Sequence, residues 1–188
     1  MSMAVMGLLA MTANAQNHDG HDGHQHTESS QHESNDKVNA EFQKQFTMVY
    51  ETYINLEEAF VQSDAKKVSE QASVVEKQLN QVDAKLVEGG TNHSWVKQQA
   101  LMKEGLKTMK ESSDIQVQRM AFSKFGDALY VSIKEFGVTR MNAYLQYCPM
   151  ALDNKGAYWL STDKKIRNPY FGDMMLGCGS TKETVSEY

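Results

Sequence analysis

Between residues 37 and 137, apolar side chains recur at steps of three and four, the spacing that gathers them on one face of an α-helix. The pattern occurs in four successive stretches. It is most regular in the second, where every step is three or four: Ala65, Val68, Ala72, Val75, Leu79, Val82 and Leu86. Four amphipathic helices with short connections predict a mainly α fold, an up-and-down four-helix bundle in which the apolar faces share one core.

Capping and turn residues predict where the first two helices begin and end. The first helix runs from residue 37 to about residue 62, and its apolar face consists of Phe42, Phe46, Val49, Tyr50, Tyr53, Leu56 and Phe60. The second helix begins after Asp64 and is expected to end at Gly89-Gly90.

The third and fourth helices are separated by the polar stretch 111–114. The third is expected to be capped by Thr91, Asn92 or Ser94, and its apolar face consists of Trp95, Leu101 or Met102, Leu106 and Met109. The fourth ends near Gly137, and its apolar face consists of Ile115, Phe122, Phe125, Leu129, Ile133 and Phe136.

The helical pattern ends at Val138, where short extended stretches replace it. Residues 144–150 read Tyr-Leu-Gln-Tyr-Cys-Pro-Met and residues 157–161 read Ala-Tyr-Trp-Leu-Ser, with an Asn-Lys-Gly turn between them. Two such stretches around a turn predict a hairpin. Residues 167–172 then turn into a short helix carrying Met174 and Met175. We expect the hairpin and the short helix to pack on one end of the bundle, so that residues 37–188 form one domain.

The first fifteen residues have the composition of a signal peptide. Residues 4–10 are a short apolar run, and Ala13-Asn14-Ala15 has the small-x-small form of a cleavage site. Cleavage after Ala15 predicts a periplasmic protein. Because no Lys or Arg precedes the run, either the true start lies upstream or the signal is unusually short; a buried N-terminal helix is the alternative. No other apolar run approaches the ~20 residues that span a bilayer, so no membrane insertion of the mature chain is expected.

Residues 16–36 form a His-rich tract without apolar residues, which predicts a disordered tail. Its histidines are His18, His21, His24, His26 and His32. Imidazole is a good ligand for Zn, Cu(II) and Ni, so the tract is interpreted as a flexible metal-capture tail. The alternative is a solvated spacer in which the histidines have no role.

The charge distribution excludes some classes of partner. Of 24 acidic residues, five precede residue 37, which leaves 19 against 19 basic residues in the rest of the chain. A neutral domain without a basic stripe is not typical of nucleic-acid binders. The sequence also lacks His-Glu-x-x-His, Gly-x-Ser-x-Gly, P-loop and Cys-x-x-Cys motifs, so a non-catalytic role is expected.

Four blocks in the last third of the chain carry a family resemblance. They are Tyr-Cys-Pro-Met-Ala at 147–151, Gly-Ala-Tyr-Trp-Leu-Ser at 156–161, Ile-Arg-Asn-Pro-Tyr-Phe-Gly at 166–172 and Met-Leu-Gly-Cys-Gly at 175–179. In this order they resemble an exported bacterial family known as domain of unknown function DUF3347; the helices resemble it more loosely. Its members occur alone or attached to periplasmic adaptors of copper and silver efflux systems. The resemblance implies a link to heavy-metal resistance or efflux, with an efflux adaptor as a partner.

The two cysteines allow two interpretations. Thiolate and thioether sulfur select soft ions such as Cu(I) and Ag(I). Cys148 and Met150 would share a face of an extended segment, and Met175 and Cys178 would share a face of a helical turn, so these four residues are the predicted Cu(I) ligands. Met174 is a reserve ligand and Trp159 a shield against water. The alternative is a Cys148–Cys178 disulfide, which would make the domain a stapled module docking on an efflux adaptor or another envelope protein.

Overall fold

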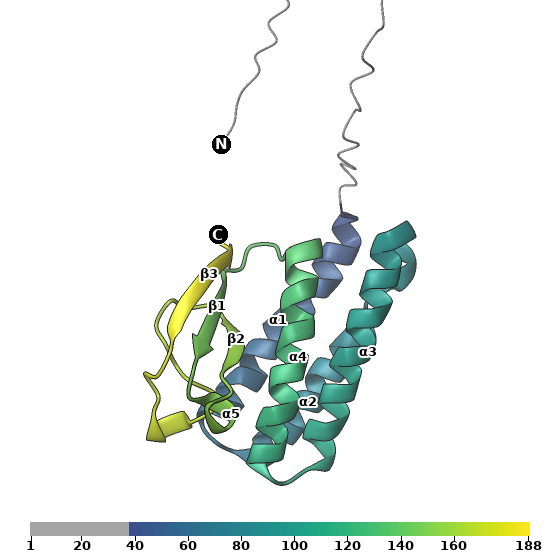
Figure 1. Cartoon of the computed structure of the whole chain (residues 1–188). Coiled ribbons are helices and arrows are strands. Elements are labelled where there is room, and N and C mark those ends of the chain that lie inside the picture. The colour runs from purple at the N-terminus through teal and green to yellow at the C-terminus, as the bar shows by residue number, and fades with distance from the viewer. Residues whose placement is uncertain (1–37) are drawn as a thin grey trace, which may run out of the picture. The chain divides into compact units, whose positions relative to one another are not determined.

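The computed structural model describes residues 38–188. Its four long helices are α1 (Ala40–Val61), α2 (Ala65–Leu79), α3 (Gly89–Glu111) and α4 (Ile115–Phe136). They lie side by side with alternating directions, and each packs on the next along the chain (Figure 1). The predicted four-helix bundle is confirmed. The predicted signal peptide and His-rich tail lie outside the described residues.

Three of the predicted helix boundaries are confirmed by their capping contacts. The Asp64 side chain accepts a hydrogen bond from the backbone N–H of Lys67 at 2.9 Å and begins α2. Asp114 caps α4 in the same way, by accepting from Gln116 at 2.8 Å. Helix α4 ends before Gly137, whose φ of 70° is in the left-handed region that glycine tolerates.

The second helix is shorter than predicted. It ends at Leu79, and the 3₁₀ helix η1 (Ala84–Leu86) follows. The prediction of one helix up to Gly89-Gly90 was wrong because Asp83 begins η1: its side chain accepts from the N–H of Lys85 at 3.0 Å, and its own N–H donates to Gln45 on α1 at 2.9 Å. The apolar spacing continued past Leu79 because Val82 is buried in this connection as well.

The third helix begins earlier than predicted, at Gly89. The predicted caps Thr91, Asn92 and Ser94 therefore lie inside α3. Asn92 has a different role, because its amide donates to the carbonyls of Ala84 at 2.7 Å and of Val87 at 3.1 Å. This side chain ties η1 to the first turn of α3.

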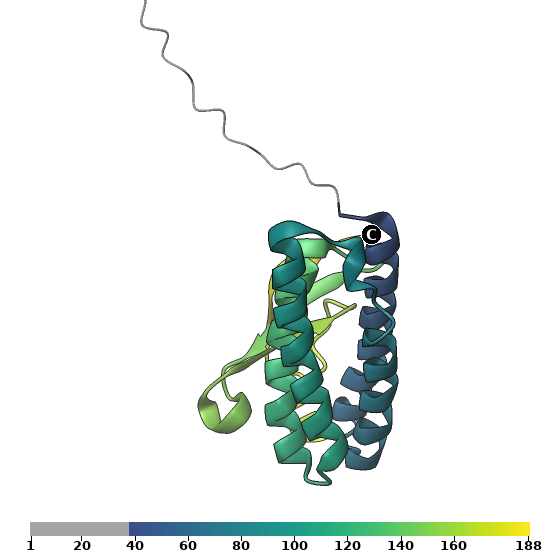
Figure 2. The same cartoon turned by 90° about the vertical axis from the view of Figure 1, so that its right-hand side faces the viewer.

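A three-stranded antiparallel sheet follows the bundle. Its strands are β1 (Ala143–Cys148), β2 (Ala157–Ser161) and β3 (Ser180–Ser186), in the order β2-β1-β3. The predicted hairpin is β1 and β2, whereas β3 was not predicted. The sheet lies along α1 and α4 (Figures 1 and 2). Two buried tyrosines of α1 join it to the bundle: Tyr50 donates to the carbonyl of Ser161 at 3.2 Å, and Tyr53 donates to that of Leu160 at 3.0 Å.

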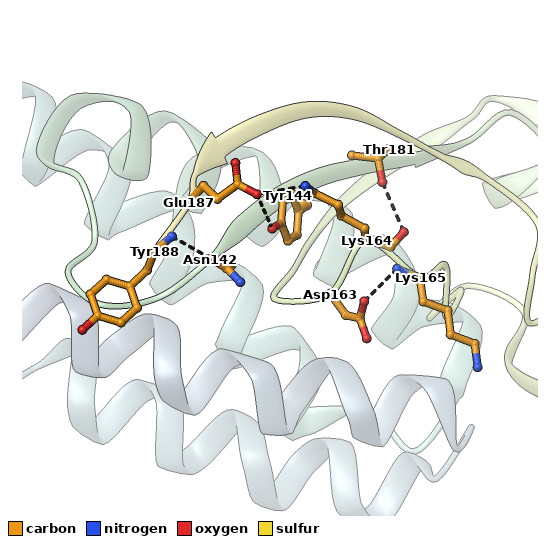
Figure 3. Close-up of polar contacts among 8 residues, drawn as sticks. All are labelled: Asn142, Tyr144, Asp163, Lys164, Lys165, Thr181, Glu187 and Tyr188. Atoms are coloured by element: carbon orange, nitrogen blue, oxygen red, sulfur yellow. Dashed lines mark hydrogen bonds and ion pairs between the residues drawn. The ribbon is translucent and has the colours of Figure 1, made fainter.

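Polar contacts hold β3 to β1 and to the loop after β2 (Figure 3). Lys164 donates to the Glu187 carboxylate at 2.9 Å and lies 5.2 Å from the centre of the Tyr144 ring. The N–H of Tyr188 donates to the Asn142 side chain at 2.8 Å. These contacts hold the C-terminal end of β3, whereas Cys178 lies two residues before the other end of this strand.

The predicted short helix is the 3₁₀ helix η2 (Gly172–Met174). It contains Met174 but ends before Met175. A second short element, α5 (Ala151–Asn154), connects β1 to β2. Within residues 38–188, no helix combines the length and apolar character needed to cross a membrane.

One carboxyl group lies inside the bundle. Glu57 is on the buried face of α1 between Tyr53 and Phe60, and only 6 % of its surface is exposed. Burial raises the pKa of this carboxyl well above its ordinary value, and the charge of Arg167 opposes the shift. The folded state therefore disfavours ionised Glu57, so this residue weakens the fold at neutral pH.

Replacing this carboxyl with its neutral isostere is expected to stabilise the fold. We expect Glu57→Gln to raise the free energy of unfolding at pH 7.5, by about 1–3 kcal/mol if the gain matches the usual cost of a buried polar group without a partner. Because the folded pKa lies above the unfolded value of 4.5, the contribution of Glu57 to stability is fully present below pH 4.5 and is lost as the pH rises through the folded pKa. The gain should therefore vanish at pH 4. Urea unfolding at pH 7.5 and at pH 4 measures the change in the free energy of unfolding, with Glu51→Gln at an exposed position as the control. Equal destabilisation by Glu57→Gln at the two pH values would contradict the expectation.

Candidate metal site

The two cysteines meet where β1 ends and β3 begins. Cys148 is the last residue of β1, and Cys178 lies two residues before β3. The antiparallel register sets Tyr147 opposite Ser180, which brings the cysteines together. Their Sγ atoms are 2.8 Å apart, and both are free thiols. Cys148 is fully buried and Cys178 is half-buried, so solvent reaches this sulfur pair from the side of Cys178.

Asn168 fixes the backbone at Cys178. It is fully buried, and its side-chain amide donates to the carbonyl of Cys178 at 2.7 Å. Its side-chain oxygen accepts from the N–H of Tyr170 at 2.8 Å, and its own N–H donates to the carbonyl of Leu176 at 2.8 Å. One asparagine thus closes residues 168–178 into a loop, which we call the anchoring loop.

Two side chains attach the anchoring loop to the rest of the domain. Arg119, a buried residue of α4, donates to the carbonyl of Pro169 at 3.0 Å and to the hydroxyl of Ser63 at 2.9 Å. Tyr170 donates from its hydroxyl to the carbonyl of Tyr158 on β2 at 2.7 Å. The sequence predicts neither contact, although Asn-Pro-Tyr belongs to one of the blocks that carry the family resemblance. The sulfur pair is therefore held by both the helices and the sheet.

Close packing also surrounds the residue after Cys178. A Cβ added to Gly179, whose φ is 136°, would lie 2.9 Å from the Trp159 ring and 2.9 Å from the carbonyl of Tyr147. Only glycine fits there. Trp159 is buried, as a shield would be, and its ring lies against the backbone next to Cys178.

The environment of the sulfur pair disfavours a thiolate at Cys178. The hydrogen bond with Cys148, then burial, and then repulsion by the Cys148 sulfur raise the pKa of the Cys178 thiol to about 11. Cys178 is therefore a protonated thiol at neutral pH. A metal ion that binds there has to displace the proton, because the thiolate is the ligand.

The local geometry predicted for the two methionine ligands was wrong. Met150 follows Pro149 with φ −88° and ψ −11°, so it does not continue the strand of Cys148. Met175 has φ −148° and ψ 55° and lies after η2; the N–H of Cys178 donates to the Met175 carbonyl at 3.0 Å, so the two residues close an isolated turn rather than the predicted short helix. The prediction extended regular structure one residue too far in both places. Met150 instead lines a cavity with Met174, and among the described residues neither cysteine belongs to its wall.

Other classical metal ligands do not supplement the sulfur pair. Within residues 38–188, no group of three or more His, Cys, Asp or Glu side chains is placed to hold a metal ion. His93 is exposed near the start of α3. The predicted tail ligands His18, His21, His24, His26 and His32 lie outside the described part of the chain.

The helical part of the chain matches a known family. The profile of a family described as "Protein of unknown function (DUF3347)" matches residues 49–141, from within α1 to just before β1. The chain belongs to the DUF3347 family. The match covers the helices, whereas the blocks on which the resemblance was recognised, 147–179, follow it. No curated protein and no solved structure matches the chain.

Proposed function

We propose that this DUF3347 protein is a non-catalytic accessory protein of the bacterial periplasm that binds copper as Cu(I). The observation that carries the proposal is the sulfur pair: two thiols 2.8 Å apart, one fully buried and the other half-buried. Soft sulfur ligands in a partly buried position favour monovalent copper or silver over harder ions.

Metal binding requires a small opening of the sulfur pair. With metal–sulfur bonds of about 2.3 Å, two sulfurs on one ion lie about 3.8–4.6 Å apart, so the Sγ atoms have to separate by about 1–2 Å. Cys178 is the residue that can move, because Cys148 belongs to a buried strand and Cys178 to a half-buried loop. Met150 and Met175 remain proposed additional ligands that reach the ion only with such a rearrangement.

Two further parts of the proposal rest on the sequence. The five tail histidines would capture Zn, Cu(II) or Ag(I) before transfer to the folded domain. A periplasmic adaptor of a metal efflux system would receive the copper, as the family resemblance implies. The neutral charge of residues 37–188 supports partners other than nucleic acid.

A Cu(I) competition titration on the full chain tests the proposal. The protein is prepared from the periplasm without thiol reductants, and ascorbate keeps copper as Cu(I). We expect Cys148→Ser and Cys178→Ser each to weaken binding at the sulfur pair by at least about 100-fold, because each removes one of two thiolate ligands. A variant with all five tail histidines changed to Gln is the matched control and should keep the tight site. Unchanged affinity in both cysteine variants would exclude the sulfur pair.

One observation favours a second candidate function, the stapled docking module. The Sγ separation of 2.8 Å is closer to the roughly 2.05 Å of a disulfide than to the distance between two sulfurs on one metal. The same titration distinguishes the two functions. No tight Cu(I) binding, with both cysteines resistant to alkylation until a reductant is added, would identify a staple worth about 3–4 kcal/mol.

A further inference from the structure

Three methionines line one surface cavity away from the sulfur pair. Met120 comes from α4, Met150 from the turn that begins α5, and Met174 from η2. The cavity has a volume of about 720 Å³. Its methionines are 52 %, 46 % and 73 % exposed, respectively. We call this the methionine cavity.

Exposure is unusual for this residue type and calls for a role other than packing. Methionine side chains commonly fill gaps in cores, as Met102 and Met109 do in α3. Within residues 38–188, four methionines are exposed, and three of them line this one cavity. The fourth, Met48 on α1, lies outside its wall. Three thioethers from separate segments therefore share one solvent-accessible space.

The backbone beside Met150 has an uncommon conformation. Leu152, Asp153 and Asn154 have φ values of 51°, 57° and 62°, which form a left-handed turn. Each such residue costs of order 1 kcal/mol or more and persists only where the surroundings determine it. A hydrogen bond from the N–H of Gly156 to the carbonyl of Ala151, 3.0 Å long, closes the turn. In Figure 2 this green turn projects from the end of the hairpin, and it forms one wall of the cavity.

We propose that the methionine cavity is a thioether site for one soft monovalent ion, Cu(I) or Ag(I). Thioether sulfur is a neutral, soft ligand that selects such ions. The wall also carries Lys124, Lys155 and Asp153, a net charge of +1. This charge opposes a divalent ion more strongly than a monovalent one. Three long side chains with three rotatable bonds each can converge on an ion that enters from solvent. The site needs neither cysteine and goes beyond the function proposed above.

The two sites differ in their response to pH. A thioether has no proton to lose, so its affinity for Ag(I) is expected to stay constant between pH 5 and 8. The tail histidines become protonated below their ordinary pKa of about 6.5 and then stop binding metal. Measurements at pH 5 on the full chain therefore isolate the methionine cavity from the tail.

The test is a silver nitrate titration of the full chain carrying ¹³C-methyl methionine, followed by NMR at pH 5. The signals of Met120, Met150 and Met174 should shift together and saturate at one Ag(I) beyond any ion bound by the sulfur pair, while that of Met48 should not move. Loss of even an outer-shell partner costs about 10- to 100-fold in metal affinity, so each of Met120→Leu, Met150→Leu and Met174→Leu should weaken binding at least about tenfold. Met48→Leu is the matched control and should have no effect.

Three results would overturn the proposal. The first is no common shift of the three methyl signals. The second is an affinity that falls no further in Met120→Leu than in Met48→Leu. The third is loss of the shifts in Cys148→Ser or Cys178→Ser, because the methionines would then belong to the cysteine site. Persistence of the shifts in these cysteine variants would support a separate site, whether or not the sulfur pair binds Cu(I).

Discussion

Raising the pH from 6 to 9 is expected to strengthen Cu(I) binding at the sulfur pair by at least about 1,000-fold, tenfold for each pH unit. The cause is the proton on Cys178. Because the pKa of this thiol is raised to about 11, the group remains protonated across the whole range, and each bound ion has to release that proton. A cysteine with the ordinary pKa of 9.0 would show a rise that levels off above pH 9.

The measurement is a competition titration at five pH values from 6 to 10, with the pH dependence of the competing chelator measured separately. The slope of log affinity against pH decides the outcome. A slope of one or more that persists above pH 9 supports a proton held by the sulfur pair. A plateau starting near pH 9 would mean that the Cys178 thiol titrates normally and that the contact with Cys148 does not restrain its proton.

The helices could be predicted because their apolar residues had to reach one core. A step of three or four on every turn leaves little choice of structure, and the bundle followed from it. Strand β3 could not be found in this way. It is an edge strand in which Val185 is the one apolar residue, and it depends on backbone hydrogen bonds to β1 rather than on burial. A polar stretch of this kind has no periodic signal to detect.

Two buried charged residues did leave a signal that was overlooked. Arg119 lies four residues after Ile115 and three before Phe122, which is a position on the buried face of α4. Glu57 lies in the same way between Tyr53 and Phe60 on α1. A charged residue at a core position of a helix predicts a specific partner, because burial without one is costly. The position of Arg119 on the buried face of α4 therefore predicts that it holds a segment far away in the sequence, here the anchoring loop.

The candidate site was predictable only in part. That the two cysteines act together followed from their number and from the blocks around them. Their placement depends on β3 pairing with β1, which brings Cys178 beside Cys148, and that pairing was not visible in the sequence. The methionines were misplaced because spacing determines a shared face only where the structure is regular. Pro149 ends the strand before Met150, and η2 ends before Met175.

Replacing Asn168 with alanine is expected to destabilise the domain by about 2–5 kcal/mol, since a buried donor or acceptor left without a partner costs about 1–3 kcal/mol. Two backbone groups would lose their partner: the carbonyl of Cys178 and the N–H of Tyr170. The same change releases the backbone at Cys178. We therefore expect its thiol to move away from Cys148, its pKa to fall towards the ordinary value of 9.0, and its alkylation at pH 8 to accelerate.

Two further variants separate stability from positioning. Asn168→Asp keeps the acceptor for the Tyr170 N–H but puts a buried carboxylate in place of the donor to the Cys178 carbonyl, so it should accelerate alkylation with a loss of stability at least as large. Asn142→Ala removes a side chain–backbone hydrogen bond at the surface, from the N–H of Tyr188, and should leave the thiols unchanged. Urea unfolding gives the stabilities, and mass spectrometry gives the alkylation rates under folding conditions. If Cys178 is alkylated at the wild-type rate in Asn168→Asp, the position of Cys178 does not depend on Asn168. The anchoring loop is then held through Arg119 and Tyr170 instead.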